Sequence, residues 1–208
     1  MKRLSIFVAA LIGLIGLSAC GGAPEAGAPA GPSFEEVITT RRCVRDYDAA
    51  RKISEEEVRA LVKTALEAPS WRNYEESRYY VVLSGEPLEA VKNMVGANKE
   101  RVSNAPVMIV STFVKGMSGF HKDGTPTDSN GDCWGAYDCG LSNSYFVLAA
   151  RAAGYDTLIM GARDEEGLRS LLGIPESEAV LSVIALGYRA SEPKRPERKS
   201  VDEVAKFF

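Results

Sequence analysis

The eleven residues from Gly22 to Pro32 separate two parts of the chain that differ sharply in composition. They are Ala, Gly and Pro with a single charged residue, so they cannot bury a core and are expected to form a flexible tether. A compact fold must therefore lie within residues 33–208. About 175 residues are enough for one domain with a sizeable core.

The residues before this linker have the form of an export signal. Lys2 and Arg3 precede an apolar run, residues 6–17, that is too short to span a bilayer. The run ends in Leu-Ser-Ala-Cys, which resembles the lipobox of bacterial lipoproteins. That resemblance implies a signal peptide over residues 1–19 and a lipid-anchored Cys20 followed by the linker to residue 32. The expected location is then the cell envelope, membrane-anchored and outside the cytoplasm. An ordinary signal peptide with a chance cysteine is the alternative.

Composition argues against several classes of function. The chain has 25 basic and 28 acidic residues, a net charge of −3 and no basic stripe, so we expect no nucleic-acid partner. His121 is the single histidine, which argues against a His-built metal site and a Ser-His-Asp triad, and we expect no metal. Cys43, Cys133 and Cys139 are expected to be free thiols, although a loop could bring the last two together.

Helical and strand patterns alternate along residues 33–208, which predicts an α+β fold. Ser33 with Glu36, and Ser54 with Glu57, have the spacing of capping boxes that begin helices. The long apolar helix and the apolar C-terminal tail both suggest contact with a second subunit. We expect further helices over 88–97 and 137–153 and after Asp164, strands over 79–83, 107–113, 157–160 and 180–186, and an exposed loop over 117–131.

The first segment that carries chemistry is the run Arg-Arg-Cys-Val-Arg at residues 41–45. Arg41 and Arg45 are four residues apart, so on a helical turn they project from one face. Two guanidinium groups on one face suit a phosphate dianion. A solvated basic helix end is the alternative.

Two further segments point in the same direction. Residues 68–73, Ala-Pro-Ser-Trp-Arg-Asn, form a turn in which Ser70 is expected to cap a short helix, and the Asn73 amide can both donate to and accept from a flat heterocycle. Residues 194–199 form a basic cluster before a short capped helix. A capping turn with a surface asparagine and a solvated linker are the respective alternatives.

Together these segments resemble the FMN-dependent nitroreductase family over nearly all of residues 33–208. The resemblance rests on the order and spacing of short motifs: Arg-Arg-x-x-Arg at 41–45, Ala-Pro-Ser-x-x-Asn at 68–73, Asp-x-Gly at 138–140, Gly-Ala-x-Asp at 161–164 and Leu-Leu-Gly-Ile-Pro at 171–175. It implies a mixed sheet wrapped by helices, in a homodimer that binds FMN at its interface.

The resemblance also implies roles for individual residues. Arg41, Arg42 and Arg198 would hold the ribityl phosphate, with Lys199 the less favoured alternative to Arg198. Cys43 would line the ribityl chain. Arg45 would lie near N1 and O2 of the ring. The pyrimidine edge would meet a turn of the partner subunit that carries Pro69, Ser70 and Asn73. The backbone of Met160 and Gly161, at the end of a strand, would approach N5 and O4.

The function implied is transfer of two electrons from NAD(P)H or another reductant, through flavin N5, to a small acceptor such as a nitroaromatic or a quinone. No acid–base residue is assigned, because the flavin supplies the chemistry. The acceptor side is expected near Trp71, Phe120 and His121, each of which can equally be ordinary packing or surface. NAD(P)H is scarce outside the cytoplasm, so a non-catalytic flavin- or ligand-binding lipoprotein is the alternative.

The chain departs from the family pattern at three positions after Asn73. Glu75 stands where glutamine is usual, Glu76 where proline is usual and Ser77 where an aromatic is usual. A carboxylate at position 75 cannot donate a hydrogen bond as glutamine does, and its charge opposes electron density on reduced flavin. Cys43 also replaces a common serine, so phosphate contacts there should come from the backbone.

Overall fold

The computed structural model describes residues 31–208, which form one unit. Residues 1–30, with the expected signal peptide and Cys20, lie outside the described residues.

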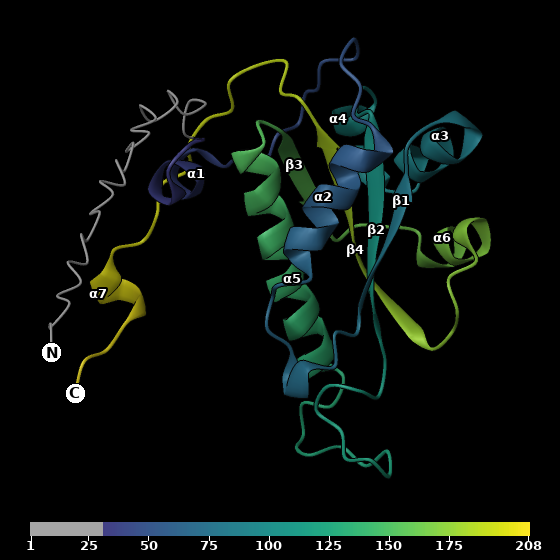
Figure 1. Ribbon diagram of the computed structural model, residues 1–208, viewed down its shortest axis with the longest axis vertical. Helices are drawn as coiled ribbons and strands as arrows, with labels where there is room; N and C mark the ends of the chain where they lie inside the picture. The colour runs from purple at the N-terminus through teal and green to yellow at the C-terminus, as the bar shows by residue number, and fades with distance from the viewer. Residues whose placement is uncertain (1–30) are drawn as a thin grey trace, which may run out of the picture. The chain divides into compact units, whose positions relative to one another are not determined.

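The centre of the unit is an antiparallel sheet in the order β1-β2-β4-β3 (Figure 1). The two inner strands are β-branched, apolar and almost completely buried, as expected for strands covered on both faces. The strands are β1 (Ser77–Val82), β2 (Val107–Val114), β3 (Asp156–Met160) and β4 (Glu178–Gly187).

Helices cover both faces of this sheet. One face packs on α2 (Glu55–Ala65) and α5 (Cys133–Ala152), where Ile109 of β2 lies in the same apolar core as Leu61 and Phe146. The other face packs on smaller helices around Met108 and Val110. These are α3 (Gly85–Asn93), α4 (Lys99–Val102) and α6 (Glu165–Leu172). The domain is thus a three-layer sandwich with the long helix α5 along one side (Figure 1).

Local hydrogen bonds explain where the helices begin. Ser33 Oγ accepts from the Glu36 amide and caps α1, whereas Ser54 and Glu57 form the complete, reciprocal capping box of α2. Four short helical elements complete the described chain. They are α1 (Phe34–Thr40), the capped α7 (Val201–Val204) and two 3-10 turns, η1 (Trp71–Asn73) and η2 (Gly96–Asn98).

The predicted fold class is confirmed, and each expected helix and strand is present with its ends moved by a few residues. Helix α5 begins at Cys133, one turn before the expected start at Tyr137, so Asp138 lies inside the helix. The four strands pair only antiparallel, and the sheet becomes mixed through a single parallel bridge from Cys43 to Thr157. Cys133 and Cys139 share α5 and, with Cys43, are free thiols as predicted.

Candidate functional site

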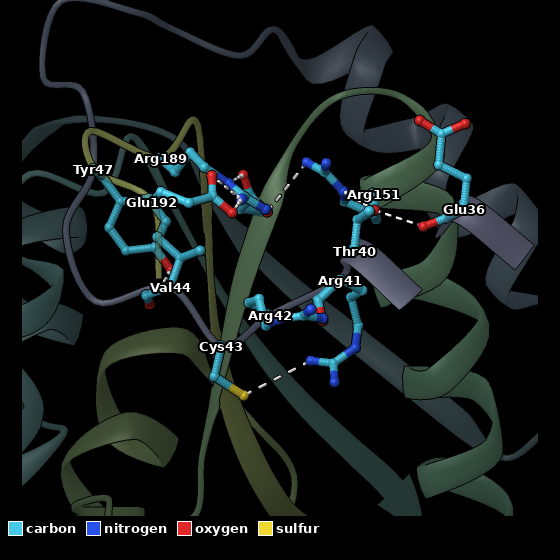
Figure 2. Close-up of polar contacts among 11 residues, drawn as sticks. Glu36, Thr40, Arg41, Arg42, Cys43, Val44, Tyr47, Arg151, Arg189 and Glu192 are labelled. Carbon is cyan, nitrogen blue, oxygen red and sulfur yellow. Dashed lines mark hydrogen bonds and ion pairs between the residues drawn. The ribbon is translucent and has the colours of Figure 1, made fainter. Parts of the chain in front are cut away.

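The basic segment at residues 41–45 is extended, and the predicted helical turn is wrong. Helix α1 ends at Thr40, and Arg41 has φ −60° and ψ 131°. The Val44 amide then donates to the Thr157 carbonyl at 3.0 Å, which lays the segment beside β3. Because side chains of an extended chain alternate with a period of two, Arg41 and Arg45 still share one side. Cys43 lies between them, with its sulfur 3.9 Å from Arg41 Nη1 (Figure 2).

Arginines of the third segment gather around the first. The pKa of Arg42 is lowered by partial burial and then by the positive charges of Arg195, Arg41, Arg198 and Arg189. Within residues 31–208, no carboxylate forms an ion pair with any of these except Arg189. Such unmatched positive charge suits a phosphate dianion, which offers several oxygens to guanidinium groups. The structure therefore brings together two segments about 150 residues apart in sequence.

Buried ion pairs hold this basic cluster in place. Asp156, at the start of β3, accepts two hydrogen bonds from Arg189, at 2.8 and 2.6 Å. Arg151 of α5 lies 3.6 Å from the same carboxylate and donates from Nε to Thr40 Oγ1 at 3.0 Å, immediately before Arg41 (Figure 2). The hydrogen bonds that Arg189 donates to Asp156 raise the pKa of Arg189. Sequence reasoning missed Asp156 because Arg189, which donates two hydrogen bonds to it, is 33 residues away in the chain.

The second predicted segment forms the η1 turn, with Ser70 at its N-cap position. Ser70 does not cap the turn as expected, because its hydroxyl instead accepts from the Glu75 amide at 3.0 Å. Arg72, Asn73 and Glu75 have φ of 50°, 58° and 51°. Left-handed backbone costs about 1–2 kcal/mol per non-glycine residue, and clusters of such strain occur at ligand sites.

The carboxylate of Glu75 lies against Asn73. Asn73 Nδ2 donates to Glu75 Oε1 at 2.8 Å. One of the two amide hydrogens of Asn73 is used in this way, so its second amide hydrogen and its carbonyl oxygen remain for a ligand. The turn can therefore both donate a hydrogen bond to a heterocycle and accept one from it.

The η1 turn is anchored to α5 by a long-range hydrogen bond. The Trp71 amide donates to Asp138 Oδ2 at 2.7 Å, and Asp138 is buried. Ser118 donates to the same oxygen at 2.8 Å. The Asp-x-Gly motif signalled Asp138, but nothing in the sequence pointed to Ser118.

Met160 and Gly161 lie where β3 ends. Met160 is buried, and the exposed Gly161 carbonyl accepts from Arg163 Nη1 at 2.7 Å. The strand end thus presents backbone rather than a side chain, and the approach of these main-chain groups to flavin stays a prediction.

One subunit keeps the basic cluster and the η1 turn apart. The basic cluster is tied to α5 at Arg151, and the η1 turn is tied to α5 at Asp138. These positions are thirteen residues apart on one helix, which corresponds to about 20 Å at ~1.5 Å per residue.

Comparison with known proteins gives a consistent result. The model of the family described as "Nitroreductase family" matches residues 38–95 and 83–188. A protein of Archaeoglobus fulgidus, named as a candidate NADH dehydrogenase/NAD(P)H nitroreductase, is 32% identical over 161 residues, which cover 76% of this chain and 86% of the relative. A candidate NAD(P)H nitroreductase of Bacillus subtilis is 26% identical, covering 84% of this chain and 97% of the relative.

Solved structures agree on the fold. A candidate nitroreductase of Exiguobacterium sibiricum, crystallised with FMN, superposes with a TM-score of 0.77 at 20% identity and covers 85% of this chain and 98% of its own. A candidate NAD(P)H:FMN oxidoreductase of Staphylococcus epidermidis gives a TM-score of 0.74 at 24% identity, covering 85% and 96%.

The location expected from the N-terminus, a membrane-anchored lipoprotein of the cell envelope, is wrong. Four of the relatives that match are named for activities that consume NAD(P)H, a reductant scarce outside the cytoplasm, and none of these four names describes an anchored protein. Within residues 31–208, no helix is long and apolar enough to cross a membrane.

We expect Asp156→Asn to destabilise the domain by about 3–5 kcal/mol, because it removes the buried carboxylate charge beside the partly buried guanidinium of Arg189, which keeps only its exposed partner Glu192. Chemical denaturation measures this loss. Glu192→Gln is the matched control, since Glu192 pairs with the same Arg189 but its side chain is 78% exposed, and we expect little change. Equal effects of the two variants would contradict the anchoring role of Asp156.

Proposed function

The chain belongs to the nitroreductase family, and from this membership we propose that it is an FMN-dependent oxidoreductase that passes two electrons from NAD(P)H to a small acceptor such as a nitroaromatic or a quinone. The observation that carries the proposal is the cluster of arginines without carboxylate partners at residues 41–45 and 195–198. It is matched by a strained turn that offers an amide to a heterocycle.

The residues fit FMN at both of its polar ends. Arg41, Arg42 and Arg198 supply charge-assisted donors for the phosphate. Cys43 lies between Arg41 and Arg45 on the same extended segment, which suits the ribityl chain. Arg45 would then sit near N1 and O2, where a positive charge stabilises reduced flavin.

The other ring contacts would come from the η1 turn and the end of β3. Pro69, Ser70 and Asn73 would face the pyrimidine edge, and the backbone of Met160 and Gly161 would approach N5 and O4. Bound FMN supplies hydride and electron transfer, whereas this chain's residues bind it, orient it and set its electrostatic surroundings.

A homodimer would complete this site. The basic cluster and the η1 turn lie about 20 Å apart along α5 in one subunit. If each flavin took its phosphate contacts from one subunit and the Pro69–Asn73 turn from the other, both half-sites would be used. The separation of the two half-sites therefore supports an interface that contains the cofactor.

Exposed apolar surface supports the same assembly. Phe34, Tyr145 and Phe207 are large hydrophobic residues that residues 31–208 leave exposed. An open groove of about 500 Å³ lies beside the first two, between α1, α2 and α5. Apolar surface of this kind typically marks a protein interface.

The visible spectrum of the purified full-length chain tests the proposed function. We expect a yellow protein that bleaches anaerobically on addition of NADH or NADPH and recovers its colour with a nitroaromatic or a quinone. Bleaching by dithionite alone would instead support a flavin-binding protein without this turnover. A colourless protein that does not take up added FMN would refute both.

Arg41→Ala and Arg198→Ala should each weaken FMN binding about 10- to 150-fold, because a charge-assisted hydrogen bond contributes ~1.5–3 kcal/mol and ~1.4 kcal/mol is tenfold. Fluorescence titration of flavin measures the affinity. Riboflavin lacks the phosphate and serves as the control ligand, whose affinity should change far less. If both ligands lose affinity equally, the arginines act on folding and not on phosphate.

Mixing of variants tests the shared site. Arg41→Ala and Asn73→Ala homodimers should both bind FMN weakly. A heterodimer of the two has one site with both substitutions and one site with neither, so co-refolded mixtures should recover tight binding at up to half of the sites in each heterodimer. Mixtures that bind no better than the separate variants would show that each subunit builds its site alone.

A further inference from the structure

Two buried acids lie beneath the η1 turn and share one hydroxyl group. Glu76 is 0% exposed, Asp138 5% and Ser118 1%. Ser118 Oγ lies 2.8 Å from Glu76 Oε1 and 2.8 Å from Asp138 Oδ2. Glu76 occupies the position where the resemblance leads one to expect proline, so this cluster belongs to the departure of this chain from the family pattern.

The geometry requires a shared proton. A hydroxyl has one hydrogen and can donate to only one of two acceptors. If both acids were ionised, the hydroxyl could donate to only one of them, and a lone pair of its oxygen would face the other carboxylate oxygen without a hydrogen between them. Both contacts are satisfied only when one acid is protonated and donates to Ser118, which donates in turn to the other acid.

The surroundings of the two acids differ, and they place the proton on Glu76. Asp138 Oδ2 also accepts from the Trp71 amide at 2.7 Å, so its negative charge is stabilised by two donors. Glu76 Oε2 is buried with no hydrogen-bond partner among residues 31–208. Burial is also the largest cause that raises the pKa of Glu76, and Asp138 adds to it.

The groups that face Glu76 offer no compensating positive charge. From α5 these are Asp138 and the buried thiol of Cys139, whose pKa is raised mainly by burial. From the loop after β2 it is Ser118, and β2 itself contributes the Val114 amide, which donates to the Glu76 carbonyl. In the described part of the chain, neither acid forms an ion pair with a lysine or arginine.

We propose that Glu76 is a positioning residue that, as a neutral acid, completes a hydrogen-bonded chain through Ser118 and Asp138 to the Trp71 amide and so holds the η1 turn in its binding shape. What the turn binds rests on the proposed function. Ionisation of Glu76 at higher pH places two negative charges around one hydroxyl, and the turn that carries Ser70 and Asn73 is released.

The direction of the pH dependence follows from linkage. The pKa of Glu76 is higher in the folded, turn-closed state than in the unfolded chain, where glutamate titrates near ~4.3. The stabilisation is therefore fully present below that unfolded pKa and is lost as pH rises through the folded pKa. For linkage to one proton, affinity falls by at most about tenfold per pH unit.

The test is the pH dependence of FMN affinity for the full chain and for Glu76→Gln, whose neutral amide can donate to Ser118 at every pH. We expect the FMN dissociation constant of the wild type to rise with pH. The dissociation constant of Glu76→Gln should equal the wild-type value at low pH and should not change as pH rises, apart from changes common to all variants. Ser118→Ala interrupts the chain and should weaken binding throughout. Glu178→Gln is the control, because Glu178 is also buried but is held by Tyr80 and Thr112 on the opposite face of β2.

Tryptophan fluorescence of the cofactor-free chain gives a readout that does not depend on FMN. The chain has two tryptophans, and Trp71 and Trp134 lie 5.2 Å apart between ring centroids, so opening of the turn should change their emission. We expect a pH transition in the wild type and none in Glu76→Gln. The same transition in both proteins would overturn the role of Glu76, whereas a transition abolished by Glu76→Gln in a chain that never binds FMN would refute only the proposed function.

Discussion

The buried carboxylate of Asp156 is the group on which the basic end of the domain depends. Burial lowers the pKa of Arg42 most, and the positive charges of the arginines around it lower that pKa further. Asp156 neutralises Arg189 and attracts Arg151, which in turn fixes Thr40 before the basic segment. Asp156 does not pair with the other guanidinium groups of the cluster, which have no carboxylate partner within residues 31–208. The same contact that stabilises the fold thus preserves the positive charge that suits a phosphate.

Helix α5 turns this local arrangement into a constraint on assembly. Its C-terminal end holds the basic segment, and its N-terminal end holds the η1 turn. Because a helix is rigid over about 20 Å, no side-chain rearrangement within one subunit joins the two groups. In the proposed homodimer, a second copy placed across the exposed side of α5 would supply the missing half and would cover Tyr145, which is exposed in the single chain.

Features encoded by neighbouring residues were predictable from the sequence, and features that depend on distant partners were not. The capping boxes and apolar periods located the helices and strands, because both signals arise within a few residues. The conformation of residues 41–45 was missed because helical and extended periods both place Arg41 and Arg45 on one side. The contacts of Asp156 join it to Arg189, 33 residues away, and left no local signal. The four-residue lipobox pattern gave the wrong location.

The two glutamates that replace the usual residues after Asn73 have opposite environments. Glu75 is exposed and binds the Asn73 amide, so its charge stays in the turn that would face the flavin. Glu76 is fully buried and donates through Ser118 only if it is neutral. In the proposed site, a charge at position 75 would oppose electron density on reduced flavin, while Arg45 would favour it. The balance between them would set how readily the cofactor accepts a hydride, and Glu76 would govern whether the turn that carries Glu75 is held in place at all.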